Sequence, residues 1–326
     1  MLIDGFGRRI TYARISITDR CDFRCIYCMS ENMVFLPRPR ILTLEELFQV
    51  SEALVSLGVE KIRITGGEPL VRKGALGLIR QIGGLPGLRE LVITTNGSRL
   101  AEHAAQLKAA GIRRINVSLD SLDEDRFRQL TRVGDLGTVL NGIDVARHEG
   151  LSVKLNAVIL KGRNDDEICN LVRFSLARGL DISFIEEMPL GVVDGHDRSE
   201  DYCSSDEVRL RLASQFELLP SLETTGGPSR YYRVAGSESR VGFISPHSHN
   251  FCHTCNRIRI TAEGRLLLCL GNEHSVDLKT VLRDEATDQD RLRQCIVDAM
   301  ALKPERHHFE VKAQPVILRH MSATGG

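Results

Sequence analysis

The chain has 326 residues with 43 basic and 43 acidic side chains, so its formal net charge is zero. This balance excludes a global attraction to nucleic acid or to a membrane surface, and an anionic ligand has to be met by a local cluster. No apolar run reaches the roughly 18 residues that span a bilayer, and nine cysteines without a signal peptide favour a reducing, cytoplasmic compartment with cysteines used for metal.

Strand and helix patterns alternate from the N-terminus to about residue 188. Strands are expected over residues 12–18, 61–65, 90–94, 113–118, 152–159 and 181–186. Helices are expected over residues 43–57, 74–82, 100–110, 124–130, 139–149 and 165–177. Strand–helix repeats with short connections predict a parallel sheet with helices outside it.

The expected strands alternate aliphatic and polar residues, which places the two kinds on opposite faces of the sheet. The aliphatic set should meet the outer helices. The other face should carry Arg14, Ser16, Thr18, Arg63, Thr65, Asn116, Ser118, Lys154 and Asn156. A closed eight-stranded barrel fills its interior with branched apolar residues, so this polar interior predicts an open barrel that holds a ligand. An antiparallel sheet with one wet face is the alternative, which the intervening helices disfavour.

After residue 188 the pattern changes. Residues 189–205 are rich in Gly, Asp and Ser and are expected to form a surface loop before a helix over 205–216. Short strands are expected over residues 231–234, 241–245, 258–261 and 266–269, followed by a helix over 288–300. This change predicts two domains, a barrel over residues 1–225 and a smaller α+β domain over 226–326. His307-His308 is expected on the surface of the tail, and Gly325-Gly326 is expected to fray.

Three cysteines lie within eight residues of the chain, Cys21, Cys25 and Cys28, at a C-x3-C-x2-C spacing. They are too close together for a disulfide framework, and a zinc site usually takes four protein ligands. Three thiolates in one loop suit an iron–sulfur cluster in which each cysteine holds one iron and a fourth iron stays open for chemistry. Three unconnected thiols at this spacing would be a rare coincidence.

A second cysteine group lies near the C-terminus, with Cys252 and Cys255 followed by Cys269 after a hairpin-like pair of strands. The hairpin would return Cys269 to the other two. On residue types alone two metals remain open. One is a second cluster, and the other is a zinc site completed by His249, His253 or His274. The first loop and the two arginines beside Cys255 favour the cluster.

The glycine pair Gly66-Gly67 follows an expected strand. Without Cβ atoms, these residues let a ligand lie against the backbone at the carboxyl end of the strand, where parallel barrels place their sites. The stretch is not a phosphate-binding loop, because neither G-x4-G-K-[ST] nor G-x-G-x-x-G is present.

Basic side chains inside the expected barrel predict an anionic ligand, because a buried charge is costly unless an opposite charge meets it. Arg14, Arg63 and Lys154 face inward by strand parity, and Arg257 and Arg259 point the same way from one strand. Any one of them could be a structural ion pair. Together they could neutralise a polyphosphate, each through a charge-assisted hydrogen bond of roughly 1.5–3 kcal/mol.

These motifs resemble the radical S-adenosylmethionine (SAM) superfamily, through the C-x3-C-x2-C loop with Tyr27 and through Gly66-Gly67-Glu68-Pro69. Within it, the chain resembles the GTP 3′,8-cyclase family of molybdenum cofactor biosynthesis. This narrower likeness covers essentially the whole chain and is carried by residues 18–21, 63–70, 94–97, 117–120, 188–191 and 252–259.

The resemblance implies an α/β fold, a partial (β/α)6 TIM-like barrel with a smaller C-terminal α+β cluster-binding domain. It implies two [4Fe–4S] clusters and SAM as cofactors. The first cluster would be held by Cys21, Cys25 and Cys28, and the second by Cys252, Cys255 and Cys269. SAM would contact Tyr27, Gly67, Ser118 and Met188. GTP would contact Arg14, Arg63, Thr94, Lys154, Arg257 and Arg259, of which the last two are the candidate catalytic residues.

The reaction implied by the resemblance starts with a 5′-deoxyadenosyl radical that abstracts the C3′ hydrogen of GTP. The C3′ radical then attacks C8 of guanine, and the product is 3′,8-cyclo-7,8-dihydro-GTP. The implied partners are GTP, an electron donor and the pathway enzyme that takes the product, with a possible homodimer and neither nucleic acid nor membrane.

Two alternatives are open, another radical SAM enzyme with an auxiliary cluster and, from a different class of protein, a zinc-binding interaction module. A peptide-modifying radical SAM maturase would usually carry more C-terminal cysteines and would need no arginine pair beside the cluster. A non-catalytic zinc-binding module would not explain the inward-facing basic residues.

Overall fold

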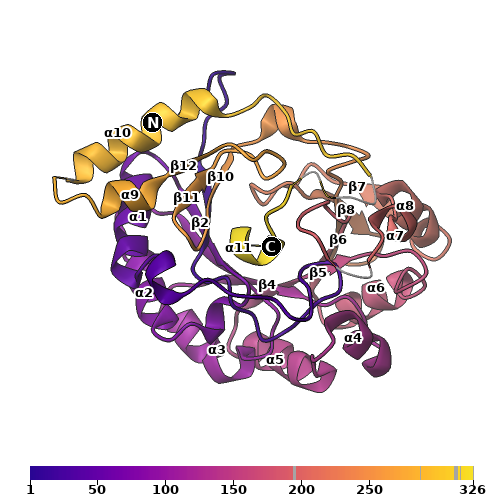
Figure 1. Ribbon diagram of the computed structural model, residues 1–326. Helices are drawn as coiled ribbons and strands as arrows, with labels where there is room; N and C mark the ends of the chain where they lie inside the picture. The colour runs from indigo at the N-terminus through magenta and orange to yellow at the C-terminus, as the bar shows by residue number, and fades with distance from the viewer. Residues whose placement is uncertain (194–195, 287, 312–314, 316, 326) are drawn as a thin grey trace.

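The computed structural model describes residues 1–326 except 194–195, 287, 312–314, 316 and 326. Among the described residues, twelve strands form one sheet in the order β12-β11-β10-β1-β2-β3-β4-β5-β6-β9-β8-β7. The strands curve into an open ring with helices on its outside (Figure 1). The expected partial α/β barrel is therefore confirmed.

The first six strands form the middle of the sheet, and each is parallel to the next. They are β1 (Tyr12–Ser16), β2 (Lys61–Thr65), β3 (Glu90–Thr95), β4 (Arg114–Ser118), β5 (Ser152–Val158) and β6 (Asp181–Ile185). Parallel strands bring their carboxyl ends to one rim of the barrel, so the loops after β1 and β2 lie together there.

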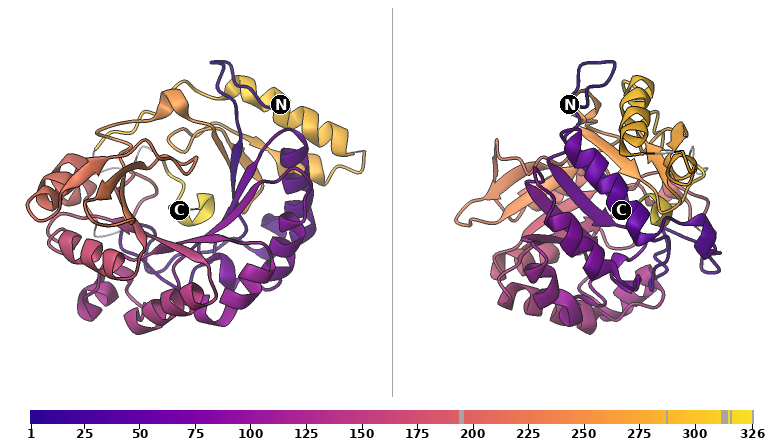
Figure 2. Two further views of the ribbon diagram at one scale, coloured as in Figure 1. Left: turned by 180° about the vertical axis from the view of Figure 1, so that it is seen from behind. Right: turned by 90° about the vertical axis from the view of Figure 1, so that its left-hand side faces the viewer.

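Helices connect these strands on the outside of the ring, as the views from behind and from the side also show (Figure 2). They are α1 (Leu44–Ser56), α2 (Ala75–Gly83), α3 (Leu100–Ala109), α4 (Glu124–Thr131), α5 (Leu136–His148) and α6 (Ile168–Ala177). The predicted start of α1 is confirmed, because Thr43 and Glu46 form a capping box.

The C-terminal part extends both edges of the barrel. Beyond β6 lie β9 (Arg240–Ile244), β8 (Arg230–Val234) and β7 (Leu218–Pro220), and beyond β1 lie β10 (Arg257–Ile260), β11 (Arg265–Leu267) and β12 (Ser275–Asp277). The predicted hairpin is confirmed, because β10 and β11 are antiparallel. The sheet is continuous across residue 225, and the division into two domains stays a prediction.

Shorter elements complete the chain. The remaining helices are α7 (Arg198–Asp201), α8 (Ser205–Ala213), α9 (Leu278–Leu282), α10 (Gln289–Ala299) and α11 (Met321–Thr324), and the 3-10 turns are η1 (Arg38–Arg40), η2 (Pro69–Val71), η3 (Cys252–Thr254) and η4 (Met300–Leu302). Helix α11 lies inside the ring of strands, near its centre (Figure 1). Residues 321–324 are therefore part of the barrel interior.

The alternation in the strands gives the two faces of the sheet the expected characters. Ile15, Ile62, Ile64 and Val117 are fully buried in the core between sheet and helices. The opposite residues line a central cavity, among them Arg14, Arg63, Thr65, Asn116, Ser118, Lys154 and Asn156. The expected polar interior is therefore confirmed for these seven positions.

The segment 189–205 differs from the expected surface loop. Its described part carries buried charged side chains: the His196 ring lies 2.7 Å from Glu187 Oε1 and 3.0 Å from Asp201 Oδ2, and Arg198 Nε lies 2.9 Å from Glu187 Oε1. Polar composition suggested solvent exposure, but these side chains are instead buried against one another.

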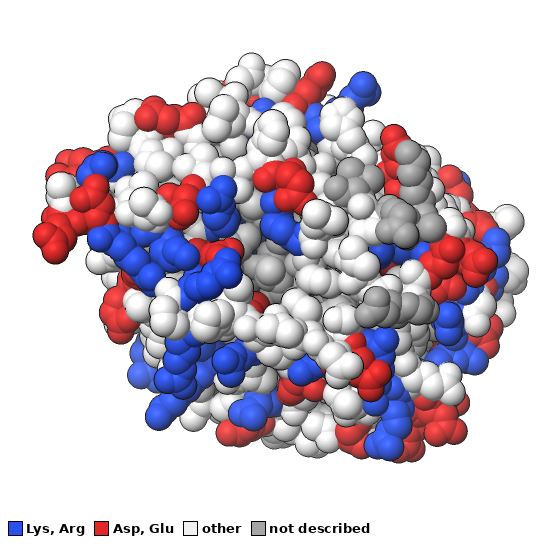
Figure 3. Space-filling view, viewed as in Figure 1, with Lys and Arg blue, Asp and Glu red and all other residues white. Residues whose placement is uncertain are grey.

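The face shown in Figure 3 carries basic and acidic side chains side by side, in keeping with the balanced composition. Among the described residues, no helix combines the length and the apolar character needed to cross a membrane.

Candidate functional site

Both cysteine groups open into one cavity of about 280 Å³ inside the barrel. Every residue predicted as a site residue lines it, namely Arg14, Cys21, Cys25, Tyr27, Cys28, Arg63, Gly67, Thr94, Ser118, Lys154, Met188, Cys252, Cys255, Arg257, Arg259 and Cys269. The predicted set is therefore assembled in one place, while the role of each residue stays a prediction.

The first cysteine loop follows β1 and packs against α4. The backbone N–H groups of Arg24 and Ile26 donate to the carbonyls of Thr131 and Leu130, and the Phe23 ring packs edge-on against Phe127 at 6.0 Å. These contacts fix the path of the loop, and its three cysteines line the cavity.

Burial raises the pKa of all three thiols in this loop, to about 12 for Cys28. Free thiols here would stay protonated at neutral pH. Iron bound to the sulfur atoms would replace those protons, because the thiolate is the form that ligates metal. The raised pKa values therefore argue against a reactive free cysteine in this loop.

The glycine pair after β2 has a packing reason that the sequence did not show. A Cβ on Gly66 would lie 2.5 Å from the Thr18 carbonyl oxygen, and one on Gly67 would collide with the Arg20 carbonyl. The backbone after β2 thus lies directly against the residues that lead into Cys21. Both glycines also line the cavity, as expected if a ligand lies against their backbone.

Tyr27 and Ser118 line the same cavity as Cys28. The Tyr27 hydroxyl donates to Asp120 Oδ2 at 2.6 Å, which fixes the ring. Burial raises the pKa of Asp120 to about 6. Asp120 follows β4 and also accepts from the Val158 N–H at the end of β5, so the aromatic residue of the cysteine loop is tied to two strand ends.

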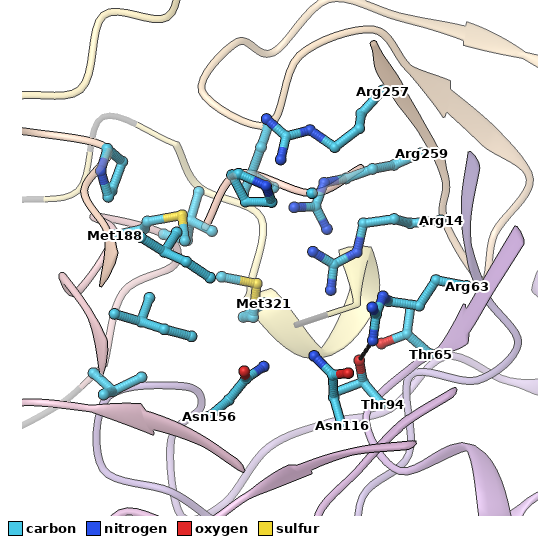
Figure 4. Close-up of a pocket in the computed structure, with 18 of the residues that line it drawn as sticks. Arg14, Arg63, Thr65, Thr94, Asn116, Asn156, Met188, Arg257, Arg259 and Met321 are labelled. Carbon is cyan, nitrogen blue, oxygen red and sulfur yellow. Dashed lines mark hydrogen bonds between the residues drawn. The ribbon is translucent and has the colours of Figure 1, made fainter. Parts of the chain in front are cut away.

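A row of arginines forms one wall of the cavity, with Met188 and Met321 opposite it (Figure 4). Strand register explains the row, because Arg14 in β1 pairs with Arg259 in β10 and with Arg63 in β2. Residues paired across adjacent strands point to the same side. Arg257, two residues before Arg259, extends the row toward the second cysteine group.

Like charges in this row favour an anionic ligand. Burial and the neighbouring Arg259 lower the pKa of Arg14, and burial and the neighbouring Arg257 lower the pKa of Arg259 to about 10. Arg63 donates through Nη1 to Thr94 Oγ1 at 2.8 Å and through Nε to the Tyr12 hydroxyl at 2.5 Å. An anion that enters the cavity would relieve the mutual repulsion of the guanidinium groups.

The sequence reasoning missed Tyr12 and Lys61, which also line the cavity. Strand parity could have found both, because Tyr12 shares the face of Arg14 and Lys61 shares the face of Arg63. Burial raises the pKa of Tyr12, but the charges of Arg63, Arg14 and Lys61 outweigh it and lower the value to about 7.

The second cysteine group lies at the other end of the arginine row, where η3 and the β10–β11 hairpin meet. Burial raises the pKa of Cys255, but the nearby charges of Arg257 and Lys303 outweigh it and lower the value to about 7. The positive surroundings therefore favour the thiolate at this position.

The zinc alternative gains no support from the described residues. His249 pairs instead with Asp206 at 3.0 Å, and His253 and His274 are exposed. Within the described part of the chain, no three His, Cys, Asp or Glu side chains are grouped so that one ion could be held. A cluster needs no such grouping, because it attaches each thiolate to a different iron.

The tail corrects two expectations. Gly325 is not frayed: its carbonyl accepts from Arg259 Nη1 at 2.6 Å, and its Cα packs against Thr65 so closely that a Cβ would collide. Gly326 lies outside the described residues.

His307 is not on the outer surface but lines the cavity beside Gly271, and burial lowers its pKa to about 4. Contacts between distant residues place the tail, so local sequence could not show this.

Comparison with known families agrees with this architecture. Residues 15–175 match the Radical SAM superfamily, and residues 180–309 match Molybdenum Cofactor Synthesis C. Among solved structures, Streptococcus suis SuiB bound to S-adenosylmethionine superposes with a TM-score of 0.61 over 97% of this chain and 77% of its own, at 17% identity. At that identity the likeness establishes the fold alone.

Curated relatives are far more similar. GTP 3′,8-cyclases of Pseudomonas putida (strain W619) and Pseudomonas entomophila (strain L48) are 63% and 64% identical, each over 100% of this chain and 98% of its own. GTP 3′,8-cyclase 2 of Pseudomonas aeruginosa is 59% identical over the same shares. With these relatives matched from end to end, the chain belongs to the GTP 3′,8-cyclase family of the radical SAM superfamily.

Proposed function

We propose that this protein converts GTP to 3′,8-cyclo-7,8-dihydro-GTP, the first step of molybdenum cofactor biosynthesis. The observation that carries the proposal is the placement of a basic wall between two cysteine triads in one cavity. A nucleotide triphosphate could lie along the arginines with its ribose and base toward the cysteines.

The family implies SAM and a [4Fe–4S] cluster, for which Cys21, Cys25 and Cys28 are the only triad in a loop of the superfamily spacing among the described residues. When bound, this pair supplies the 5′-deoxyadenosyl radical that removes the C3′ hydrogen. We further propose that Cys252, Cys255 and Cys269 hold a second [4Fe–4S] cluster that faces the guanine. Tyr27, Gly67, Ser118 and Met188 would contact SAM.

The protein's own contribution is binding, orientation and exclusion of water. Arg14, Arg63, Lys154, Arg257 and Arg259 would bind the triphosphate, each through charge-assisted hydrogen bonds of roughly 1.5–3 kcal/mol. Thr94 holds the Arg63 guanidinium, and the Tyr231 hydroxyl accepts from Lys154 Nζ at 2.7 Å. With the phosphates fixed, the ribose would be held at one position inside the barrel, where enclosure protects a radical from side reactions.

The partners and the cellular environment that we propose follow from this chemistry. We propose an external electron donor, a pathway enzyme that takes the cyclised product, and a reducing, oxygen-poor cytoplasm. A homodimer is compatible with the proposal but is not required by it, because every proposed site residue lines one cavity of one chain.

A substrate panel tests the proposed function. The reconstituted protein, incubated anaerobically with SAM and a reductant, should consume GTP with formation of 5′-deoxyadenosine and leave ATP and an unrelated peptide unchanged. Modification of a peptide with GTP ignored would favour the maturase alternative.

Substitution of Gly325 by alanine should reduce cyclisation about tenfold or more. Gly325 has a φ of 77° and lies against Thr65, and the left-handed conformation alone costs an L-residue about 1–2 kcal/mol. The tail would therefore leave the barrel and release Arg259. Turnover of GTP measures this effect. Gly236→Ala is the matched control, because Gly236 has a φ of 79° and no neighbouring atom near its Cβ position. Equal activity of the two variants would refute a role for the tail.

GTP binding should weaken as pH rises through 7, by at most about tenfold per pH unit. Tyr12 titrates in this range, and its phenolate would compete with the triphosphate for Arg63 and Arg14. The Tyr12→Phe variant should lose this component of the pH dependence. Equilibrium GTP binding across neutral pH measures it, with Tyr232→Phe as a control outside the cavity lining. An unchanged pH slope in Tyr12→Phe would contradict the assignment.

A further inference from the structure

A buried lysine, Lys303, lies beside the second cysteine group although no motif includes it. Lys303 follows η4 and is only 3% exposed. Its Nζ lies 3.7 Å from Cys255 Sγ and donates to the carbonyls of Arg257 at 3.0 Å and Leu268 at 2.5 Å.

These contacts connect the two stretches that carry Cys255 and Cys269. Arg257 begins β10 two residues after Cys255, and Leu268 immediately precedes Cys269. One ammonium group therefore spans the open end of the β10–β11 hairpin. It links the two stretches in addition to the pairing of β10 with β11.

Arg8 also forms hydrogen bonds with the backbone around the second cysteine group. Its Nη1 donates to the Cys252 carbonyl at 2.8 Å and to the Glu305 carbonyl at 2.6 Å, and its Nη2 donates to the Pro304 carbonyl at 2.6 Å. Residues 303–305 are thus held against the second triad, so Lys303 has a fixed position.

The two cations differ in how their charges are compensated. Arg8 has a carboxylate partner, Asp4 Oδ2, at 2.6 Å from its Nε. The Lys303 ammonium group, in contrast, is met by a thiol and two carbonyl oxygens. A buried cation is costly unless an anion is close. Three cysteine thiolates that hold an iron–sulfur cluster would supply that negative charge.

We propose that Lys303 is a positioning residue of the second cluster, which fixes the separation of Cys255 and Cys269 and raises the reduction potential of the cluster. This inference rests on the second cluster of the proposed function. Reduction adds negative charge to a cluster, and a fixed cation beside its sulfur ligands favours the reduced form. Removal of that charge should shift the potential to more negative values.

Three substitutions separate charge from shape. The Lys303→Gln variant keeps hydrogen-bond donors but removes the positive charge. The Lys303→Met variant keeps a long side chain but removes both charge and donors, and Lys303→Arg keeps both. Each is made in the full chain and in a Cys25→Ala background, so that the second cluster is the one observed. Iron per chain and a redox titration followed by electron paramagnetic resonance are measured, with Lys108→Met, an exposed lysine on α3, as the control.

We expect Lys303→Gln to shift the midpoint potential to more negative values, while Lys303→Arg and Lys108→Met stay near the parent. Loss of the second cluster from Lys303→Met alone would also support the inference. It would show that the three cysteines need the hydrogen bonds of Lys303 to hold the cluster. About eight irons per chain with an unchanged potential in Lys303→Gln would overturn this inference and leave the proposed function intact. About four irons in the parent chain would overturn this inference together with the second cluster of the proposed function, while GTP turnover would still test the reaction itself.

Discussion

Replacing Cys25 by alanine should abolish both cleavage of SAM and formation of cyclised GTP. Cys25 is one of three half-buried cysteines in the loop that follows β1, and all three line the cavity. Loss of one of three ligands should remove the first cluster, so iron should fall from about eight to about four atoms per chain.

The matched variant Cys269→Ala removes a ligand from the other triad. It should lose about the same amount of iron and should not cyclise GTP. It should still cleave SAM slowly, because the first cysteine loop and the glycine pair are untouched. Iron analysis and the yield of 5′-deoxyadenosine measure the difference. Complete loss of cleavage in Cys269→Ala as well would contradict a division of labour between the triads.

Replacing Arg259 by alanine should weaken GTP binding by about 10- to 100-fold. Arg259 lies beside Arg14 by strand register and is buried in the cavity wall. Loss of one charge-assisted hydrogen-bonding group costs roughly 1.5–3 kcal/mol, and about 1.4 kcal/mol corresponds to tenfold in affinity. Uncoupled cleavage of SAM should remain largely intact. Equilibrium binding of GTP and release of 5′-deoxyadenosine are the two measurements.

Two further variants make this result interpretable. Arg257→Ala should also weaken binding, and it leaves the contact between Arg259 and the Gly325 carbonyl in place. Arg233→Ala on β8 is the control, because its half-exposed side chain pairs with Glu223 and Glu238 away from the cavity. If Arg259→Ala and Arg257→Ala lost binding and cleavage together, the pair would have a folding role.

Local pattern is sufficient to predict much of the barrel and one face of the site. Alternation in β1 and β2 places Arg14 and Arg63 inside the barrel, and the capping box places the start of α1. Tyr12 and Lys61 follow the same alternation, but they were not predicted as cavity residues because they stand at the first positions of their strands. Their place in the cavity follows from the parity of Arg14 and Arg63.

Long-range contacts cannot be predicted in the same way. Lys303 meets Cys255 across 48 residues of chain, and Gly325 meets Arg259 across 66. Nothing in the neighbourhood of either residue in the sequence indicates a partner. The expectation for the polar stretch after Met188 was wrong for a related reason, since His196 and Arg198 are buried against carboxylates that its composition alone does not pair with them.

The most direct test of the proposed reaction follows a single hydrogen atom. GTP carrying deuterium at C3′ is incubated anaerobically with the reconstituted protein, SAM and a reductant, and the 5′-deoxyadenosine is analysed by mass spectrometry. Transfer of one deuterium per cyclised GTP is the predicted result, because the proposed binding mode places the ribose between the basic wall and the first cysteine loop. Cyclisation of GTP with no deuterium in the 5′-deoxyadenosine would contradict it.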